Sequence, residues 1–144
     1  MAAPPIQAKD LNNQPFDGTA VQGKVALLFF WSLAGGEHSL GAIPVVQEVT
    51  DWFKGRPELV VLGISLDPEA RETVAQLMER KKASFRTLMD EGMKLARAFE
   101  LGGVPSFVLI GADGTVKWAK LGAGPALKDE LVRAVEKALP AAKN

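Results

Sequence analysis

Hydrophobic positions gather in short runs along the chain, and turn-forming residues separate these runs. Residues 24–31 and 59–66 are apolar at nearly every position, which predicts strands covered on both faces of a sheet. Residues 106–110 and 116–121 predict two further strands. The Asp-Gly pair between them predicts a hairpin turn, because this pair readily adopts the positive φ angles that such a turn needs.

Apolar residues at helical spacing predict four helices between and after these strands. The first covers about 39–54, and Pro44 should kink it near its start because proline lacks the N–H of a helix hydrogen bond. The second covers about 67–82, with Asp67 as the N-cap and Pro68 in the first helical position. The other two cover about Met93 to Phe99 and Ala126 to Leu139.

The order of these elements predicts an α/β fold. Strand and helix alternate in the first half, which implies parallel strands with right-handed crossovers, and the second half adds an antiparallel hairpin and a closing helix. Residues 6–11 and the surroundings of Phe16 predict a small N-terminal hairpin. We therefore expect one domain over residues 1–144, with its core at about 6–139 and a mixed sheet of four to five strands flanked by helices.

Charge and hydropathy argue against two classes of protein. Lys and Arg number 17, as do Asp and Glu, so the chain lacks the basic excess of a nucleic-acid-binding protein. The most basic segment is Arg80-Lys81-Lys82. It stands at the end of a predicted helix, where cations are stabilised by the negative end of the helix dipole. No apolar run approaches the roughly 20 residues that span a bilayer. We expect no nucleic-acid partner and no membrane insertion.

Cysteine and histidine counts limit the chemistry further. The chain has no cysteine, which excludes disulfides, thiolate catalysis and cysteine-bound metals. A single histidine, His38, cannot form a histidine cluster, so we expect no metal and no cofactor. Residues 1–5 lack the pattern of a signal peptide. This favours a cytoplasmic protein, although an exported protein trimmed of its signal peptide would have the same N-terminus.

Five segments stand in an order and spacing that one family shares. They are the Gly-Lys-Val to Phe-Phe-Trp strand at 23–31, Pro44, residues 62–67, the Gly-Val-Pro loop ending at Pro105, and the Asp-Gly turn. Together they resemble the thioredoxin superfamily, in its TlpA-like or redoxin (AhpC-TSA-like) branch of thiol–disulfide oxidoreductases. The resemblance covers residues 6–139 and implies a thioredoxin-like fold in which Pro105 is the cis-proline.

The Trp-Cys-x-x-Cys motif of this family is missing. Counted forward from Trp31, its two cysteine positions fall on Gly35 and His38. Counted back from the kink proline, they fall on Gly36 and Ser39, so the loop holds one extra residue. Thiol–disulfide exchange requires a thiolate. We therefore expect a degenerate site with no catalytic residue of the redox kind.

Two further features of the family motif are absent. Ala34 or Gly35 replaces the tryptophan before the first cysteine, and Ala42 replaces the acidic residue two positions before the kink proline. A cysteine trap made in the laboratory would change two residues and leave the tryptophan, the spacing and the acid. The joint loss therefore indicates natural divergence.

The segment around the lost motif keeps features that could bind a ligand. Gly36, Glu37, His38 and Ser39 stand where a helix begins, and the free N–H groups of a helix N-terminus favour an anion. The alternative is that Ser39 is an N-cap and His38 a solvated loop residue. A nucleophilic Ser–His pair is disfavoured, because adjacent helical residues point about 100° apart.

Val104 and Pro105 complete the candidate binding surface. In the family, the backbone before the cis-proline pairs with a bound peptide, which implies a strand-addition surface. The alternative is that the proline serves the fold alone. We expect a redox-inactive module that binds a protein or peptide, and not an enzyme. The alternatives are a family member by homology alone, an enzyme of another class that uses His38, and a structural partner domain whose oligomeric state the sequence does not specify.

Overall fold

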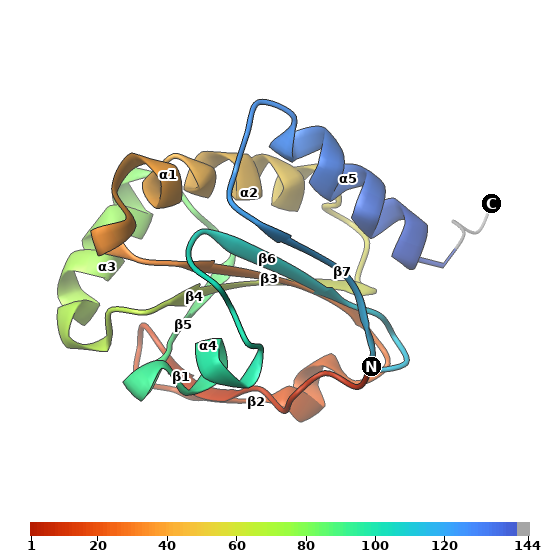
Figure 1. Cartoon of the computed structure of the whole chain (residues 1–144), viewed down its shortest axis with the longest axis horizontal. Coiled ribbons are helices and arrows are strands. Elements are labelled where there is room, and N and C mark those ends of the chain that lie inside the picture. Colours follow the sequence, from red (N-terminus) through yellow and green to blue (C-terminus); the bar gives the residue numbers. More distant parts are fainter. Residues whose placement is uncertain (141–144) are drawn as a thin grey trace.

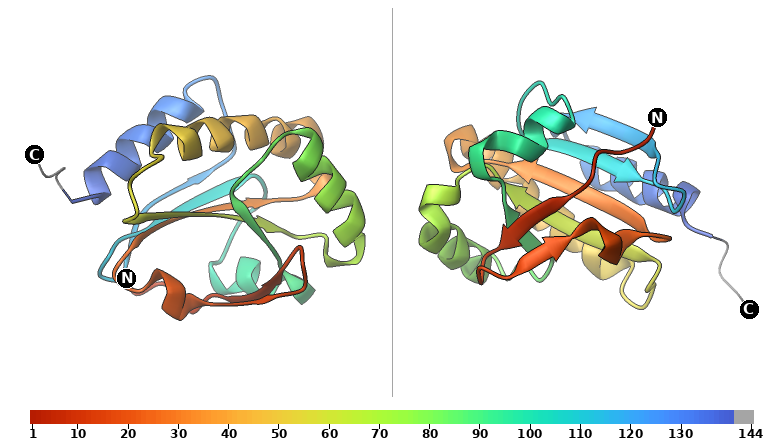
Figure 2. Two further views of the ribbon diagram at one scale, coloured as in Figure 1. Left: turned by 180° about the vertical axis from the view of Figure 1, so that it is seen from behind. Right: turned by 90° about the horizontal axis from the view of Figure 1, so that it is seen from below.

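A computed structural model describes residues 1–140 of the chain (Figures 1 and 2). Within these residues, seven strands form one mixed sheet in the order β2-β1-β5-β4-β3-β6-β7. The last four residues of the expected domain, 141–144, lie outside the described part.

Most predicted elements are present with slightly different bounds. The strands are β1 (Gln7–Asp10), β2 (Pro15–Asp17), β3 (Val25–Trp31), β4 (Leu59–Ser65), β5 (Arg86–Met89), β6 (Ser106–Ile110) and β7 (Val116–Leu121). The helices are α1 (Gly36–Leu40), α2 (Ala42–Trp52), α3 (Arg71–Arg80), α4 (Lys94–Ala98) and α5 (Leu127–Ala138). Strands β3, β4 and β5 run parallel, and β6 and β7 add antiparallel strands at one side.

The central strand β3 separates two hydrophobic layers. All seven of its residues are buried, and its side chains alternate between the two faces. On one face Phe29 stacks against Phe107 with 5.3 Å between ring centroids, under α2, α3 and α5. On the other face Leu28 and Phe30 pack against α4 and the N-terminal hairpin. Figures 1 and 2 show these layers on opposite sides of the sheet.

The sheet has more strands than the four to five expected. The missed strand is β5, a four-residue segment that begins with Arg86 and Thr87 and so lacks a long apolar run. One edge of β5 pairs with β4. The other edge pairs with β1, with Lys9 opposite Met89 and Asp10 opposite Leu88. The N-terminal hairpin therefore extends the main sheet.

The first long helix differs from its prediction in two ways. It begins at Gly36 and not at Ser39, and it is interrupted at Gly41, between α1 and α2. Pro44 accounts for the interruption, as the sequence predicts, because it has no N–H to donate to the carbonyl of Leu40, four residues earlier. The interruption therefore lies on the N-terminal side of the proline.

Asp67 and Pro68 occupy the predicted N-cap and first helical position, but the element that they begin is a short 3-10 helix at Pro68–Ala70, separate from α3, and the carboxylate of Asp67 makes no capping hydrogen bond. The carboxylate is directed toward the end of β3 instead, where it belongs to the site described below.

Candidate functional site

The loop after β3 and the loop before β6 meet at one end of the sheet. They meet because β3 and β6 are antiparallel neighbours, with Phe30 opposite Ser106. A Cβ added to Gly35 would lie 3.2 Å from Cγ2 of Val104, so the two loops lie side by side, with no room between them for a side chain at position 35. The structure thus brings the degenerate motif and the Val104–Pro105 loop together.

Asp67 fixes the loop after β3. Its buried carboxylate accepts hydrogen bonds from Ser32 Oγ at 3.1 Å, from the N–H of Leu33 at 2.8 Å and from Ser65 Oγ at 3.1 Å. Ser32 Oγ in turn accepts a hydrogen bond from the N–H of Ala34 at 3.1 Å. Sequence reasoning missed this network. The signal available in the sequence was a pair of serines: Ser32 directly follows the apolar strand β3, and Ser65 ends the neighbouring apolar strand β4.

Gly35 occupies a position without room for a side chain. It is the N-cap of α1, and a Cβ there would collide with Oγ of Ser39 and lie 2.9 Å from Cβ of Ser39. Real Cβ atoms do not approach heavy atoms this closely. Any larger residue at position 35 therefore requires α1 or the loop to move.

Gly36 is restricted by its backbone conformation. Its φ of 61° and ψ of −148° lie in a region that only glycine adopts at low cost. The space around a Cβ at this position is open, so the constraint comes from the dihedral angles and not from contacts. Neither Gly35 nor Gly36 can thus be replaced by cysteine in this backbone without strain or displacement.

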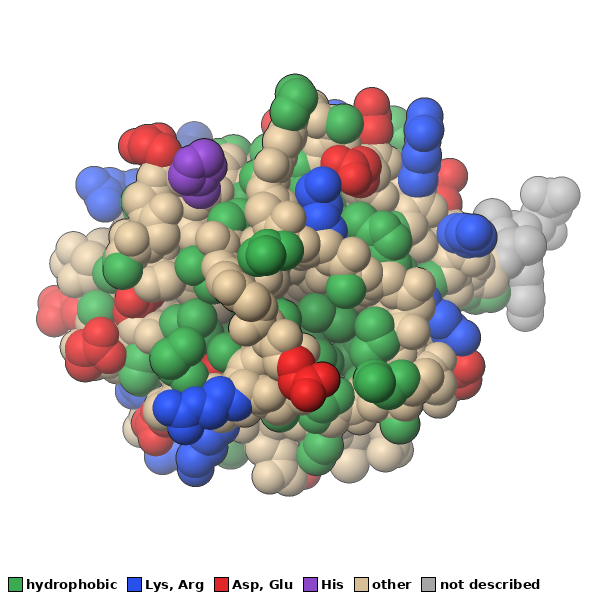
Figure 3. All heavy atoms as spheres, viewed as in Figure 1, with side chains coloured by type: hydrophobic (Ala, Val, Ile, Leu, Met, Phe, Trp, Pro, Cys, Tyr) green, Lys and Arg blue, Asp and Glu red, His purple; other side chains and the backbone are tan. Residues whose placement is uncertain are grey.

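Ser39 has a different environment from the one predicted, whereas His38 is exposed as expected. Ser39 is completely buried inside α1, so the expectation that it caps the helix is wrong. Its Oγ has no hydrogen-bond partner among residues 1–140. Glu37 and His38 are exposed, and the single histidine stands out on the molecular surface in Figure 3. No hydrogen bond joins His38 to Ser39 in the described part, so the geometry offers no nucleophilic pair.

The loop before β6 presents free backbone. The Val104–Pro105 peptide bond is cis, Pro105 is buried and Val104 is half-buried. Within the described residues, neither the N–H nor the C=O of Val104 makes a hydrogen bond. By contrast, Ser106 Oγ donates to the carbonyl of Gly103, and the carbonyl of Pro105 accepts from the N–H of Gly122 at 2.7 Å.

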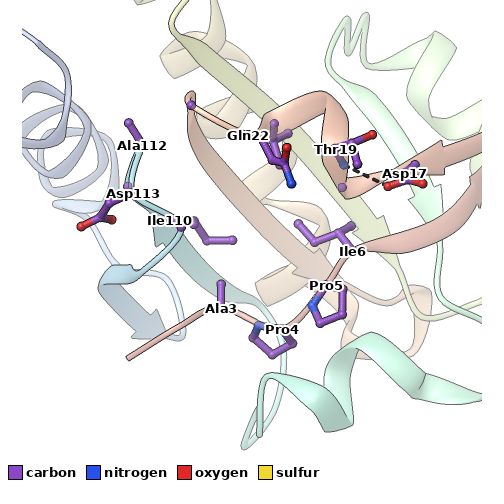
Figure 4. A pocket seen from close by; sticks show the side chains of 15 residues that line it. Ala3, Pro4, Pro5, Ile6, Asp17, Thr19, Gln22, Ile110, Ala112 and Asp113 are labelled. Atoms are coloured by element: carbon purple, nitrogen blue, oxygen red, sulfur yellow. Dashed lines mark hydrogen bonds between the residues drawn. The ribbon is translucent and has the colours of Figure 1, made fainter.

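A separate pocket of about 430 Å³ lies away from this site. Figure 4 shows it between Pro4 and Pro5 of the N-terminal segment and the turn that includes Ala112. None of the predicted site residues lines it.

Two classes of feature were not found in the described residues. No group of three or more acidic or histidine side chains is arranged to hold a metal ion among residues 1–140. Over the same residues, no helix has the length and apolar character needed to cross a bilayer.

Comparison with known proteins places the chain in a family. Residues 1–119 match the sequence model of the AhpC/TSA family. A search of curated protein sequences gave no significant match.

Solved structures resemble nearly the whole chain. DsbF of M. tuberculosis is 25% identical, with a TM-score of 0.79 over 93% of this chain and 95% of that chain. A putative thiol:disulfide interchange protein DsbE from Chlorobium tepidum is 21% identical, with a TM-score of 0.85 over 95% of this chain and 94% of that chain. A secreted disulfide oxidoreductase of M. tuberculosis is 24% identical, with a TM-score of 0.74 over 92% and 95%. These likenesses confirm the thioredoxin-like fold.

Proposed function

Because this chain belongs to the AhpC/TSA family but has no cysteine, we propose that it is a redox-inactive thioredoxin-like module. In this proposal the module binds an extended segment of a partner protein. The binding would use the former active-site surface, which we define as Gly36–His38 together with Val104 and its cis bond to Pro105; Ser39 is buried beneath this surface and is not available to a partner. One observation carries this proposal: the backbone of Val104 has no hydrogen-bond partner within the described residues, beside a loop that is held in place.

Loss of the redox reaction follows from the residues present. A thiolate must attack sulfur in thiol–disulfide exchange, and this chain has no cysteine. The burial of Ser39, three residues after Gly36, favours the count that places the lost cysteines at Gly36 and Ser39. The conformation of Gly36 also disfavours a side chain, so a cysteine at this position would strain the backbone.

Binding of an extended segment is supported by the free edge of the Val104 loop. A peptide beside this loop could accept from the N–H of Val104 and donate to its C=O, as in strand addition. Gly102 and Gly103, which precede Val104, are exposed and have no side chains of their own, and the neighbouring side chain of Leu121 is itself largely exposed. The hydrogen bonds to Asp67 hold the facing loop in one conformation, which lowers the entropy lost on binding.

The experiment selects peptides from a random library displayed on phage and measures their affinity for purified variants by fluorescence anisotropy. Gly103→Arg places a bulky side chain next to Val104, and we expect it to weaken binding by about tenfold or more. Gly124→Arg is the matched control, because Gly124 has open space around it and lies in the loop after β7. Equal binding by the wild type and Gly103→Arg would contradict the proposal, as would a failure to select any peptide.

A further inference from the structure

A second surface lies at the other end of the sheet, over the first half of β4. A hollow of about 840 Å³ opens between the end of α2 and the segment that joins α3 to β5. Figure 2 (left) views this side, with the turn after α2 in yellow and the segment after α3 in green. The hollow and the former active-site surface lie toward opposite ends of the sheet, since the hollow is over the start of β4 and the former active-site surface follows the end of its parallel neighbour β3.

The hollow is lined by apolar side chains of β4. Leu59 and Val61 are only half-buried, and this first part of β4 pairs with β3 alone, since its pairing with β5 begins at Leu62. Phe53 and Phe85 also line the hollow and are buried. This part of the sheet therefore presents an apolar surface that α2 and α3 leave partly open.

The rim of the hollow is basic. One anionic residue, Asp51, stands among the lining residues, and Gln47 donates a hydrogen bond to it at 3.0 Å. The chain as a whole has no net charge, so this is a local excess. Five lining residues are cationic: Lys54, Arg56, Lys81, Lys82 and Arg86.

Three of these cations have no acidic partner. Arg56 pairs with Glu58 at 3.1 Å, and Arg86 pairs with Asp10 at 3.0 Å. Lys54, Lys81 and Lys82 form no ion pair within residues 1–140. The three lysines are thus available to an external anionic group.

The helix dipoles account for only part of this arrangement. Lys54 follows the C-cap of α2, and Lys81 is the C-cap of α3, where cations are favourable. The dipoles do not explain Arg86, which lies on β5, nor the apolar side chains that remain accessible beneath the lysines.

We propose that this hollow, named here the basic hollow, binds an acidic segment of a partner protein that also carries an aliphatic side chain. Carboxylates of the segment would meet Lys54, Lys81 and Lys82, and its aliphatic side chain would cover Leu59 and Val61. A peptide fits this surface better than a nucleic acid does, because the accessible floor is aliphatic and offers no exposed aromatic ring for a base to stack on.

The test uses the full chain and a fluorescein-labelled peptide of sequence Glu-Glu-Leu-Glu-Glu-Leu-Glu-Glu. We expect saturable binding that weakens as salt is added. The double variant Lys54→Glu/Lys82→Glu should weaken binding by about tenfold or more, since it replaces attraction with repulsion. The matched control Lys24→Glu/Lys94→Glu reverses two exposed lysines outside the basic hollow and should bind like the wild type.

Further measurements separate the apolar and the charged contributions. A peptide with serine in place of leucine should bind at least several-fold more weakly, and backbone amide signals of residues 59–61 and 81–86 should shift in NMR spectra during titration. The proposal is overturned if the wild type shows no binding, if both double variants bind equally, or if the serine peptide binds as tightly as the leucine peptide. Tighter binding of an oligothymidylate would overturn it as well. These signals differ from those of the former active-site surface, so the two proposals can fail separately.

Discussion

At the scale of single residues, two glycines in the loop after β3 occupy positions where a cysteine would be crowded or strained. Gly35 is packed against Ser39 and Val104, and Gly36 has dihedral angles that favour glycine alone. The sequence placed the lost motif to within one residue but could not choose between the two glycines, because a glycine in a sequence reveals neither its φ angle nor its neighbours. We propose the count that places the motif at Gly36 and Ser39, because Ser39 is buried.

Gly35→Ala should lower the free energy of unfolding by about 1–3 kcal/mol, because the added methyl group overlaps Ser39. Chemical denaturation of the purified variant measures this change. Ser39→Gly in the same chain should recover part of the loss, because it removes the atoms that the methyl group meets. Gly124→Ala, at a position with open space, should change stability by less than about 0.5 kcal/mol. Equal effects of the two alanine variants would show that position 35 is not crowded.

At the scale of elements, apolar runs predicted β3, β4 and β6, and the segment after the Asp-Gly turn predicted β7, whereas β5 escaped prediction. The four residues of β5 become a strand because β1 and β4 pair with its two edges. The role of Asp67 likewise depends on pairing, because the parallel register that sets Trp31 opposite Ser65 places this carboxylate beside the loop after β3. Contacts across 34 residues of chain cannot be predicted from local periodicity.

Asp67→Asn should destabilise the loop between β3 and α1. The amide can accept with only one of its two polar atoms, so at least one of the donors from Ser32, Leu33 and Ser65 loses its partner. We expect the free energy of unfolding to fall by about 2–4 kcal/mol and the amide hydrogens of Leu33 and Ala34 to exchange faster. Glu69→Gln, at an exposed position in the same segment, should change neither quantity. Unchanged exchange at Leu33 in Asp67→Asn would refute this role.

The turn between β1 and β2 depends on pH through Asp10. Burial alone would raise the pKa of its carboxyl, but hydrogen bonds from the N–H groups of Gln14 and Asn12 and from Arg86 outweigh burial, so the pKa is lower than usual. The ionised carboxylate therefore stabilises the fold above the ordinary Asp pKa of about 3.9, and this contribution is lost as pH falls through the lowered pKa.

Asp10→Asn should cost about 1–3 kcal/mol at pH 7, with a smaller difference from the wild type as the pH falls below about 4. Denaturation measured at several pH values checks this trend. Asp129→Asn, an exposed residue of α5, should show a small and constant difference. A difference for Asp10→Asn that stays constant between pH 7 and pH 2 would contradict the assigned hydrogen bonds.

At the scale of the whole molecule, a thioredoxin-like fold of the AhpC/TSA family persists without the thiols on which exchange chemistry depends. The fold was predictable because five segments retain their order and spacing. The shape of the site was not, because it depends on the contact between two loops that are distant in sequence, near Gly35 and Val104. The backbone at Val104 and the basic hollow, on which the two binding proposals rest, lie toward opposite ends of the sheet.

Titration of the isotopically labelled protein with a selected peptide, followed by NMR, tests the central claim most directly. Binding at the former active-site surface predicts that the amide signals of Gly36, His38 and Val104 shift most, and that the amide hydrogen of Val104 becomes protected from exchange. Shifts confined to other parts of the chain, with the Val104 amide unprotected at saturation, would contradict the account.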